Sequence, residues 1–222
     1  IGDTMTQSIF DRIASIGVMP VIVIDDAEAA LPLAQALIAG GLPLAEVTFR
    51  TPAAAQAIAA MARVPGLLLG AGTVLTPDQV DAALDLGATF ALAPHFAAKT
   101  AEHALKKGLP FVPGVVTPTE MGAALDAGFS VQKFFPAESA GGAAFLKAVS
   151  APMRGIRFIP TGSIDLAKLP AYLRLPCVLA AGGSWMVAPK LIAEKKWSDI
   201  TRLAAGAVAA VQQIRAEMQE PS

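Results

Sequence analysis

The sequence has very few of the side chains that build disulfides and metal centres. It contains one cysteine, Cys177, and two histidines among its 222 residues. A single cysteine excludes a disulfide within the chain and a thiolate metal cluster, so we expect Cys177 to be a small core residue that opens a strand. Two histidines, neither placed with a carboxylate partner, are too few for the ligand set of a typical catalytic metal. We therefore predict no metal site.

Charged residues are also scarce, and they nearly balance. Lysine and arginine number 17 against 18 acidic residues, and together they make up 16% of the chain. No run of lysine or arginine occurs, so we predict neither a nucleic-acid surface nor a polybasic membrane patch. Because charge is rare, a charged residue inside an apolar segment is informative.

Long apolar runs are missing although 54% of the residues are hydrophobic. No stretch of about 18 apolar residues runs without glycine, proline or a charge, which is typical of a large α/β core rather than a membrane span. The first residues lack the basic and then apolar pattern of a secretory signal, so a cytoplasmic location is expected by default. The residues at the end of the first short apolar segment, Ile24-Asp25-Asp26-Ala27, lack the glycine-rich fingerprint of dinucleotide binding. That fingerprint would commonly mark a doubly wound open sheet.

Short apolar segments alternate with alanine-rich segments of helical spacing along the chain. The predicted strands are Val18–Ile24, Leu44–Arg50, Leu67–Thr73, Phe90–Pro94, Phe111–Val115, Ser130–Pro136, Arg157–Gly162 and Cys177–Gly183. The predicted helices include Met5–Ile16, Ala27–Ala39, Pro52–Ala62, Pro77–Leu86, Lys99–Lys107, Pro118–Ala127 and Ser198–Glu217. Eight strand and helix units predict an α/β fold, a (β/α)8 TIM barrel with a short N-terminal helix, as a single domain over residues 1–222. A doubly wound open sheet is the structural alternative.

Three strand exits carry the same dipeptide, at Thr51-Pro52, Thr76-Pro77 and Thr117-Pro118. Threonine can cap a helix and proline suits its first turn, so each dipeptide predicts a helix start. Gln79 and Glu120 lie three residues after the last two threonines and would complete capping boxes.

The second predicted strand turns a carboxylate and a guanidinium towards one face. Side chains alternate along a strand, so Glu46 and Arg50 share a face while Val47 and Phe49 share the other. The outer face of a barrel strand packs on helices and is apolar, which leaves Glu46 and Arg50 facing the interior. Arg50 then lies nearest the C-terminal mouth, where barrel enzymes keep their chemistry.

Lys133 lies between apolar residues of the sixth predicted strand, and the same alternation turns it towards the barrel interior. Burial disfavours the charged form of an amine, and a neutral amine is a usable nucleophile. A reactive amine, a proton-carrying carboxylate at Glu46 and a cation at Arg50 together describe carbonyl chemistry through a Schiff base. The alternative is a structural ion network in which Glu46 pairs with Arg50 or Lys133.

Two glycine-containing loops follow the last two predicted strands, at Gly162-Ser163 and Gly182-Gly183-Ser184. Backbone N–H groups without a neighbouring Cβ can surround a phosphate, and TIM barrels frequently place a phosphate site at these two loops. A turn or a helix C-cap would also explain each glycine.

Five motifs on these predicted strands resemble the 2-keto-3-deoxy-6-phosphogluconate (KDPG) aldolase family, the KDPG/KHG class I aldolases. The motifs are Glu46-Val47-Thr48-Phe49-Arg50-Thr51, Gly70-Ala71-Gly72-Thr73-Val74, Lys133-Phe134-Phe135-Pro136-Ala137-Glu138, Pro160-Thr161-Gly162 and Gly182-Gly183-Ser184-Trp185. The resemblance implies cleavage of KDPG to pyruvate and glyceraldehyde 3-phosphate, a step of the Entner–Doudoroff pathway, without metal or cofactor. It also implies a homotrimer.

The resemblance assigns roles by matching position. Lys133 would form the Schiff base and Glu46 would carry protons. The implied substrate contacts are Arg50, Thr73, Pro94, Phe135 and Thr161, and the implied phosphate contacts are Gly162, Ser163, Gly183 and Ser184.

The chain departs from the family pattern at two positions. Ser163 stands where relatives more often have a second glycine, and His95 follows Pro94 where they more often have glycine. Ser163 adds a hydroxyl donor to the implied phosphate pocket. We expect His95 to be a surface residue at the mouth or to lie behind the substrate contacts.

Three other functions remain as alternatives. Two are aldolases of the same group, acting on 4-hydroxy-2-ketoglutarate or on 2-keto-3-deoxy-6-phosphogalactonate, which share the lysine and differ at the recognition end. The third is a non-catalytic phosphosugar-binding barrel, which would bind ligand without forming an imine at Lys133.

Overall fold

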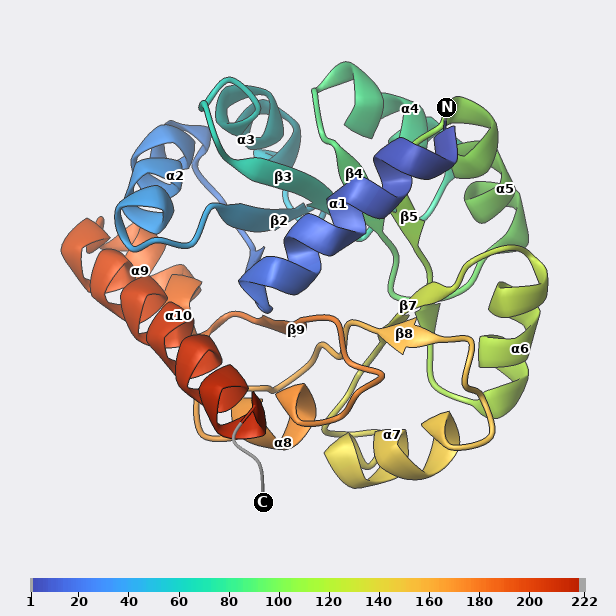
Figure 1. The fold of residues 1–222 in the computed structure, drawn as a ribbon. Coiled ribbons are helices and arrows are strands. Elements are labelled where there is room, and N and C mark those ends of the chain that lie inside the picture. The colour runs from blue at the N-terminus through green and yellow to red at the C-terminus, as the bar shows by residue number, and fades with distance from the viewer. Residues whose placement is uncertain (1, 220–222) are drawn as a thin grey trace.

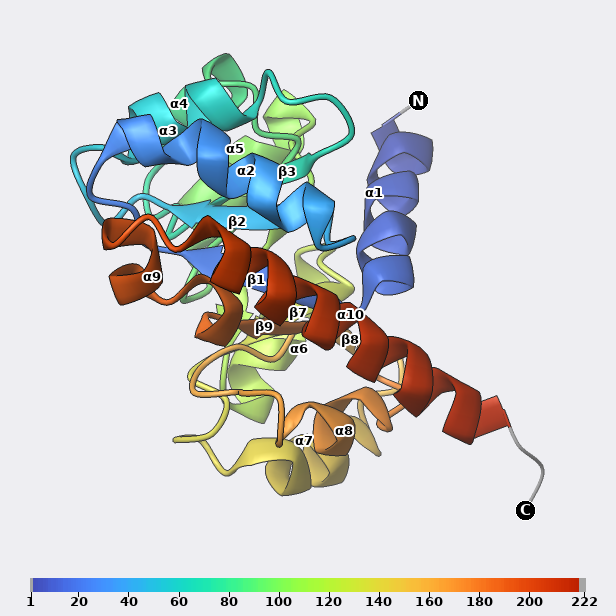
Figure 2. The same ribbon diagram turned by 90° about the vertical axis from the view of Figure 1, so that its left-hand side faces the viewer.

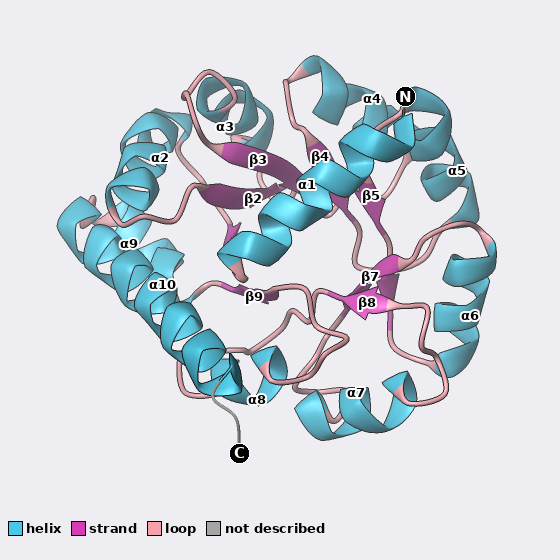
Figure 3. Cartoon of the chain, viewed as in Figure 1, coloured by secondary structure: helices cyan, strands magenta, loops and turns pink. Residues whose placement is uncertain are grey.

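The computed structural model, which describes residues 2–219, is a barrel of parallel strands surrounded by helices (Figure 1, Figure 3). Its strands are β1 (Val18–Ile22), β2 (Leu44–Thr48), β3 (Leu68–Gly72), β4 (Phe90–Leu92), β5 (Phe111–Val112), β6 (Gly114–Val115), β7 (Val131–Phe134), β8 (Arg157–Phe158) and β9 (Ala181–Gly183). Its α-helices are α1 (Gly2–Ile16), α2 (Ala30–Ala39), α3 (Ala54–Met61), α4 (Pro77–Asp85), α5 (Ala98–Lys107), α6 (Pro118–Asp126), α7 (Gly142–Ser150), α8 (Leu169–Leu173), α9 (Pro189–Ala193) and α10 (Trp197–Gln219). Two 3-10 helices, η1 (Ala27–Ala29) and η2 (Trp185–Val187), complete the order.

The strands form two sheets that join into one barrel. The first has the order β5-β4-β3-β2-β1-β9 and the second the order β6-β7-β8. β5 and β6 are consecutive pieces of the predicted fifth strand, which breaks at Pro113 because proline has no N–H to donate. One parallel bridge connects Phe158 of β8 with Val178 before β9, and another connects Thr161 after β8 with Gly182 of β9. The predicted barrel with its N-terminal helix is therefore confirmed.

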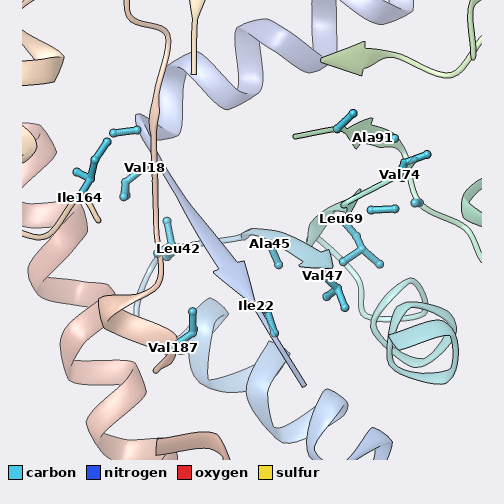
Figure 4. Packing of buried hydrophobic residues seen from close by; sticks show 14 of the residues in the cluster. Val18, Ile22, Leu42, Ala45, Val47, Leu69, Val74, Ala91, Ile164 and Val187 are labelled. Atoms are coloured by element: carbon cyan, nitrogen blue, oxygen red, sulfur yellow. The ribbon is translucent and has the colours of Figure 1, made fainter. Parts of the chain in front are cut away.

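In most strands, neighbouring residues belong to two different apolar clusters. On β2, Ala45 and Val47 pack in the shell between strands and helices, whereas Leu44 belongs to a cluster inside the barrel. β7 repeats this arrangement with Phe134 in the shell and Val131 inside. Figure 4 shows part of the shell, with Ala45 and Val47 among the apolar side chains that lie between strands and helices.

Helix α1 covers the end of the barrel at which the strands begin (Figure 1, Figure 2). Its buried side chains join the inner cluster of strand residues, and they are Ile9, Phe10 and Ile13. The Arg215 guanidinium of α10 donates to the carbonyl oxygens of Ala14 and Ser15, the second at 2.5 Å. These bonds satisfy carbonyls that the last turn of a helix leaves without partners. This end of the barrel is thus sealed by packing.

The three predicted Thr-Pro helix starts have different outcomes. At α6 the capping box between Thr117 and Glu120 is complete. At α4, Thr76 caps the helix, but the Gln79 side chain accepts from the N–H of Leu75, so that box is not closed. The prediction for Thr51 is wrong, because its hydroxyl donates to the Ile24 carbonyl and α3 begins at Ala54 without a side-chain cap.

Several predicted strands are shorter in the structure. The last one, predicted over Cys177–Gly183, narrows to β9 at Ala181–Gly183. Cys177 is half-buried and lies outside that strand, so the expectation of a core residue that opens it is wrong. Within residues 2–219, none of the helices combines the length and the apolar character needed to cross a membrane.

Candidate active site

A buried ion pair lies in the barrel interior, between Lys133 on β7 and Glu46 on β2. Lys133 Nζ lies 2.9 Å from Glu46 Oε1, and the side chains are 2% and 0% exposed. Each stands two residues beyond a member of the inner apolar cluster, Val131 and Leu44 respectively. The strand period therefore places both charged groups on top of that cluster. Lys133 Nζ also lies 5.5 Å from the ring centroid of Phe135.

The second oxygen of the Glu46 carboxylate, Oε2, is also buried. No hydrogen bond to Oε2 occurs among the described residues. Gly72, which pairs in register with Thr48, approaches the other oxygen so closely that a Cβ there would lie 2.2 Å from Glu46 Oε1. Only glycine leaves room for this carboxylate. A buried acceptor without a partner is costly, which points to a proton donor that arrives from outside the chain.

Arg50 and Thr73 meet at the C-terminal end of β2 and β3. The Arg50 Nε donates to Thr73 Oγ1 at 3.2 Å, and Arg50 makes no ion pair with a carboxylate in the described part of the chain. Thr73 has a φ of 58°, a left-handed conformation that is unusual for a β-branched residue. Strained backbone of this kind clusters at functional sites. The pair thus offers an unneutralised guanidinium to an anionic group.

A cavity of about 220 Å³ opens at this end of the barrel. It is lined by Val21, Val23, Arg50, Phe135, Thr161, Gly162, Ser163, Gly182, Gly183, Ser184 and Pro189. Seven of the predicted site residues are among them: Arg50, Phe135, Thr161 and four residues of the two glycine-containing loops. Lys133, Glu46, Thr73 and Pro94 do not line this cavity. Thr73 contacts Arg50 of its wall, and Lys133 lies two residues before Phe135 of its wall.

The two loops supply unpaired backbone donors. The N–H groups of Gly162, Ser163 and Ser184 make no hydrogen bond within residues 2–219. A Cβ at Gly182 would lie 2.3 Å from Thr161 Oγ1, so glycine is required for the two loops to approach each other. Free N–H groups on neighbouring loops, close to a hydroxyl-bearing residue, suit an anion with several oxygens.

The remaining predicted residues surround this arrangement. Thr161 is 5% exposed, and Phe135 is half-buried and followed by a cis peptide bond to Pro136. Pro94 is half-buried, and its backbone lies against Gly114, which pairs in register with Lys133. His95 is exposed.

Sequence reasoning missed three polar residues beside the Ser163 loop. Lys168 Nζ donates to the Ser163 carbonyl at 2.8 Å and lies 3.2 Å from Glu138 Oε2. The Tyr172 hydroxyl donates to Glu138 Oε1 at 2.5 Å. Glu138 is the last residue of one of the motifs that carry the family resemblance, and that position could have identified it as a site residue. Within residues 2–219 there is no group of three or more His, Cys, Asp or Glu side chains that could hold a metal ion.

Comparisons with known proteins agree on one family. The family model for KDPG and KHG aldolase matches residues 9–203. The 2-dehydro-3-deoxy-phosphogluconate aldolase of Treponema pallidum is 46% identical over 197 residues, which cover 88% of this chain and 94% of that protein.

Two solved structures are similar in both sequence and fold. The KDPG aldolase from Legionella pneumophila, with pyruvate captured as a covalent carbinolamine intermediate, has a TM-score of 0.86 and 41% identity, covering 91% of this chain and 97% of that one. The 2-keto-3-deoxy-6-phosphogluconate aldolase of Zymomonas mobilis with 3-phosphoglycerate has a TM-score of 0.84 and 41% identity, covering 90% and 95%.

Proposed function

Because the chain belongs to the family of KDPG and KHG aldolases, we propose that Lys133 is the amine on which this class I aldolase cleaves KDPG. The products are pyruvate and glyceraldehyde 3-phosphate. The buried pair of Lys133 and Glu46, with one carboxylate oxygen bonded to the amine and the other free, is the observation that carries this assignment.

Imine formation begins when Lys133 Nζ loses a proton and attacks the C2 carbonyl of the substrate. Glu46 Oε1 is within hydrogen-bond distance of the amine and is the nearest base. The resulting carbinolamine loses its hydroxyl as water, for which the Glu46 carboxyl returns a proton. The product is a cationic imine at C2, which withdraws electrons from the C3–C4 bond.

Cleavage then needs a base at the C4 hydroxyl. Glu46 Oε2 has no partner in the described residues and accepts that proton. The C3–C4 electron pair moves into the imine and gives an enamine, while the C4–C6 fragment leaves as glyceraldehyde 3-phosphate. Protonation of the enamine at C3 and hydrolysis of the imine release pyruvate and restore the amine.

The two walls of the cavity hold the two charged ends of the substrate. Arg50, together with Thr73, binds the C1 carboxylate because a guanidinium matches a carboxylate with two parallel donors. Gly162, Ser163 and Ser184 bind the phosphate on C6 through their free N–H groups and the serine hydroxyls, and Gly183 contacts it without a side chain in the way. Thr161, Phe135 and Pro94 contact the chain between these ends.

The free loop donors favour a phosphorylated substrate. 4-Hydroxy-2-ketoglutarate would leave those donors without an anion of the same shape, so we propose it as a slower substrate. The phosphogalactonate epimer differs at C4 alone and would occupy the same two ends.

A substrate panel with a pyruvate-coupled readout tests the proposal. The wild-type chain should release pyruvate from KDPG faster than from 4-hydroxy-2-ketoglutarate, and Lys133→Met should release none from any of the three acids. Pyruvate release by Lys133→Met at the wild-type rate would remove Lys133 from the mechanism. Phosphosugar binding without pyruvate release by the wild type would favour the non-catalytic barrel.

We also propose that the enzyme is a homotrimer, as its family resemblance implies, and that it is cytoplasmic. Light scattering after gel filtration would give three times the mass of one chain, 22.7 kDa. A monomeric mass for the active enzyme would contradict this.

A further inference from the structure

We propose that Lys168 is a positioning residue for the phosphate end of the cavity and fixes the loop on which Ser163 lies. It thereby sets the preference for a phosphorylated substrate. This inference rests on the proposed function.

Lys168 joins three groups from one exposed flank of the cavity. Its Nζ donates to the Ser163 carbonyl at 2.8 Å and lies 3.2 Å from Glu138 Oε2 and 3.9 Å from Asp165 Oδ2. Its own backbone N–H donates to Asp165 Oδ1 at 3.0 Å. The ammonium group therefore connects the loop that follows β8 with the segment that follows β7.

Ser163 has a backbone conformation that requires such support. Its φ is 57°, a left-handed conformation which glycine adopts freely and serine seldom does. The Ser163 N–H makes no hydrogen bond among the described residues, and Ser163 lines the cavity. Because the ammonium of Lys168 fixes the carbonyl of this residue, it also limits the directions in which the neighbouring N–H groups can point.

Glu138 is anchored from its other side by Tyr172. The Tyr172 hydroxyl is 2.5 Å from Glu138 Oε1, and the tyrosine is 1% exposed. Burial, with a smaller contribution from Glu138, raises the pKa of the Tyr172 hydroxyl above its usual range. Tyr172 therefore remains a proton donor to this carboxylate near neutral pH, and its hydrogen bond holds Glu138 beside Lys168.

Backbone hydrogen bonds also join the segment after β7 to the loop after β8. The N–H of Ala137 donates to the Thr161 carbonyl at 2.8 Å, and the N–H of Glu138 donates to the Gly162 carbonyl at 3.3 Å. Glu138 lies five residues after Lys133 along the chain. The phosphate loop is thus fastened to the segment that leaves the lysine strand. Lys168 makes no hydrogen bond or ion pair with Lys133 or Glu46 among residues 2–219, so its loss should affect binding of the phosphate rather than the chemical step.

The variant Lys168→Met tests this assignment because methionine keeps an unbranched apolar stem without the charge or the donors. We expect the KM for KDPG and the inhibition constant of inorganic phosphate each to rise about tenfold, with kcat changed less than about twofold. Pyruvate carries no phosphate, so the rate at which borohydride inactivates the enzyme with pyruvate should stay at the wild-type value.

Three further variants make the result specific. Lys168→Arg keeps a charged donor and should recover a KM within about threefold of the wild type. Tyr172→Phe should raise the KM in the same direction by a smaller factor. Lys190→Met should change nothing, because this lysine is 82% exposed and its one ion pair within the described residues is with Glu194.

An unchanged KM and phosphate inhibition constant in Lys168→Met would overturn the inference. So would an equal loss of pyruvate-dependent inactivation, which would indicate a general structural role. Failure of the proposed function is a separate result, because wild-type enzyme that releases no pyruvate from KDPG refutes it whatever Lys168 does.

Discussion

The two ends of the barrel use the same strands for different purposes. At the end covered by α1, the inward side chains are apolar, as at Leu44 and Val131. Two residues further along the same strands, the inward side chains are Glu46 and Lys133. One layer of the interior is apolar, and the next holds the charged pair that we propose for the chemistry.

The apolar layer and the charged layer should contribute differently to the free energy of folding. Burial of apolar side chains is a main source of folding free energy, at about 25 cal/mol per Å² of surface removed from water. A buried ion pair contributes little or is unfavourable, since desolvation offsets the attraction between the charges. The apolar layer should therefore stabilise the barrel, and the charged layer should be tolerated for its function.

Neutralising the charged layer gives the largest expected effect. The double variant Lys133→Met with Glu46→Gln should lower kcat/KM for KDPG by at least about a thousandfold, or about 4 kcal/mol in activation free energy. Urea unfolding should show an unchanged stability or a gain of about 1–4 kcal/mol, because the buried charges are gone. A large loss of stability would mean that the pair supports the fold and that the two layers do not differ as described.

Truncating the apolar layer should lower stability and leave kcat nearly unchanged, the reverse of what we expect for the charged layer. Leu44→Ala should lower the free energy of unfolding by about 2–5 kcal/mol through lost burial and a cavity. The kcat of the protein that remains folded should stay within about twofold of the wild type. Leu75→Ala is a matched control, since Leu75 is 40% exposed and should change stability little. A Leu44→Ala protein that is stable but inactive would place Leu44 in the catalytic layer.

The carboxylate end of the cavity can be tested without touching the buried pair. Arg50→Lys keeps the charge and loses the planar fork, so the dissociation constant of pyruvate should rise about tenfold, or about 1.4 kcal/mol. Stability should be unchanged because Arg50 is exposed. Pyruvate binding and exchange at wild-type values would make Arg50 a structural residue.

The smallest expected effect is a loss of stability at the start of α6, where Thr117 and Glu120 form the capping box. Thr117→Ala removes the capping box and should cost about 1 kcal/mol of stability without changing kcat.

The pH dependence of this cap has a definite sign. Backbone hydrogen bonds from Thr117 and Val116 lower the pKa of Glu120 below its usual range. The stability that the Glu120 carboxylate contributes is then fully present above the pKa that this group has in the unfolded chain. It is lost as the pH falls through the lowered pKa of the folded protein. Glu120→Gln should weaken that part of the acid dependence of unfolding. The same acid dependence in Glu120→Gln and the wild type would exclude this cap as its source.

The strand period alone predicted which side chains enter the barrel. Glu46 and Lys133 are 87 residues apart, yet each could be placed inside because its strand neighbours are apolar and alternate in direction. Barrel closure then leaves few positions for the two groups, and they meet.

Loop contacts could not be predicted in the same way. Thr51 has the right sequence context for a cap, but the exit of β1 offers a carbonyl that competes for its hydroxyl. Lys168 lies in a segment without periodicity, and its partners come from loops after two different strands. Such contacts depend on tertiary distances that local patterns do not contain.

Reduction with borohydride in the presence of pyruvate tests the central assignment most directly, because it converts a transient imine into a stable bond. The peptide that contains Lys133 should gain the mass of a reduced three-carbon unit, with simultaneous loss of activity. A label on another lysine, or full activity after reduction, would contradict the role of Lys133 as the Schiff-base residue.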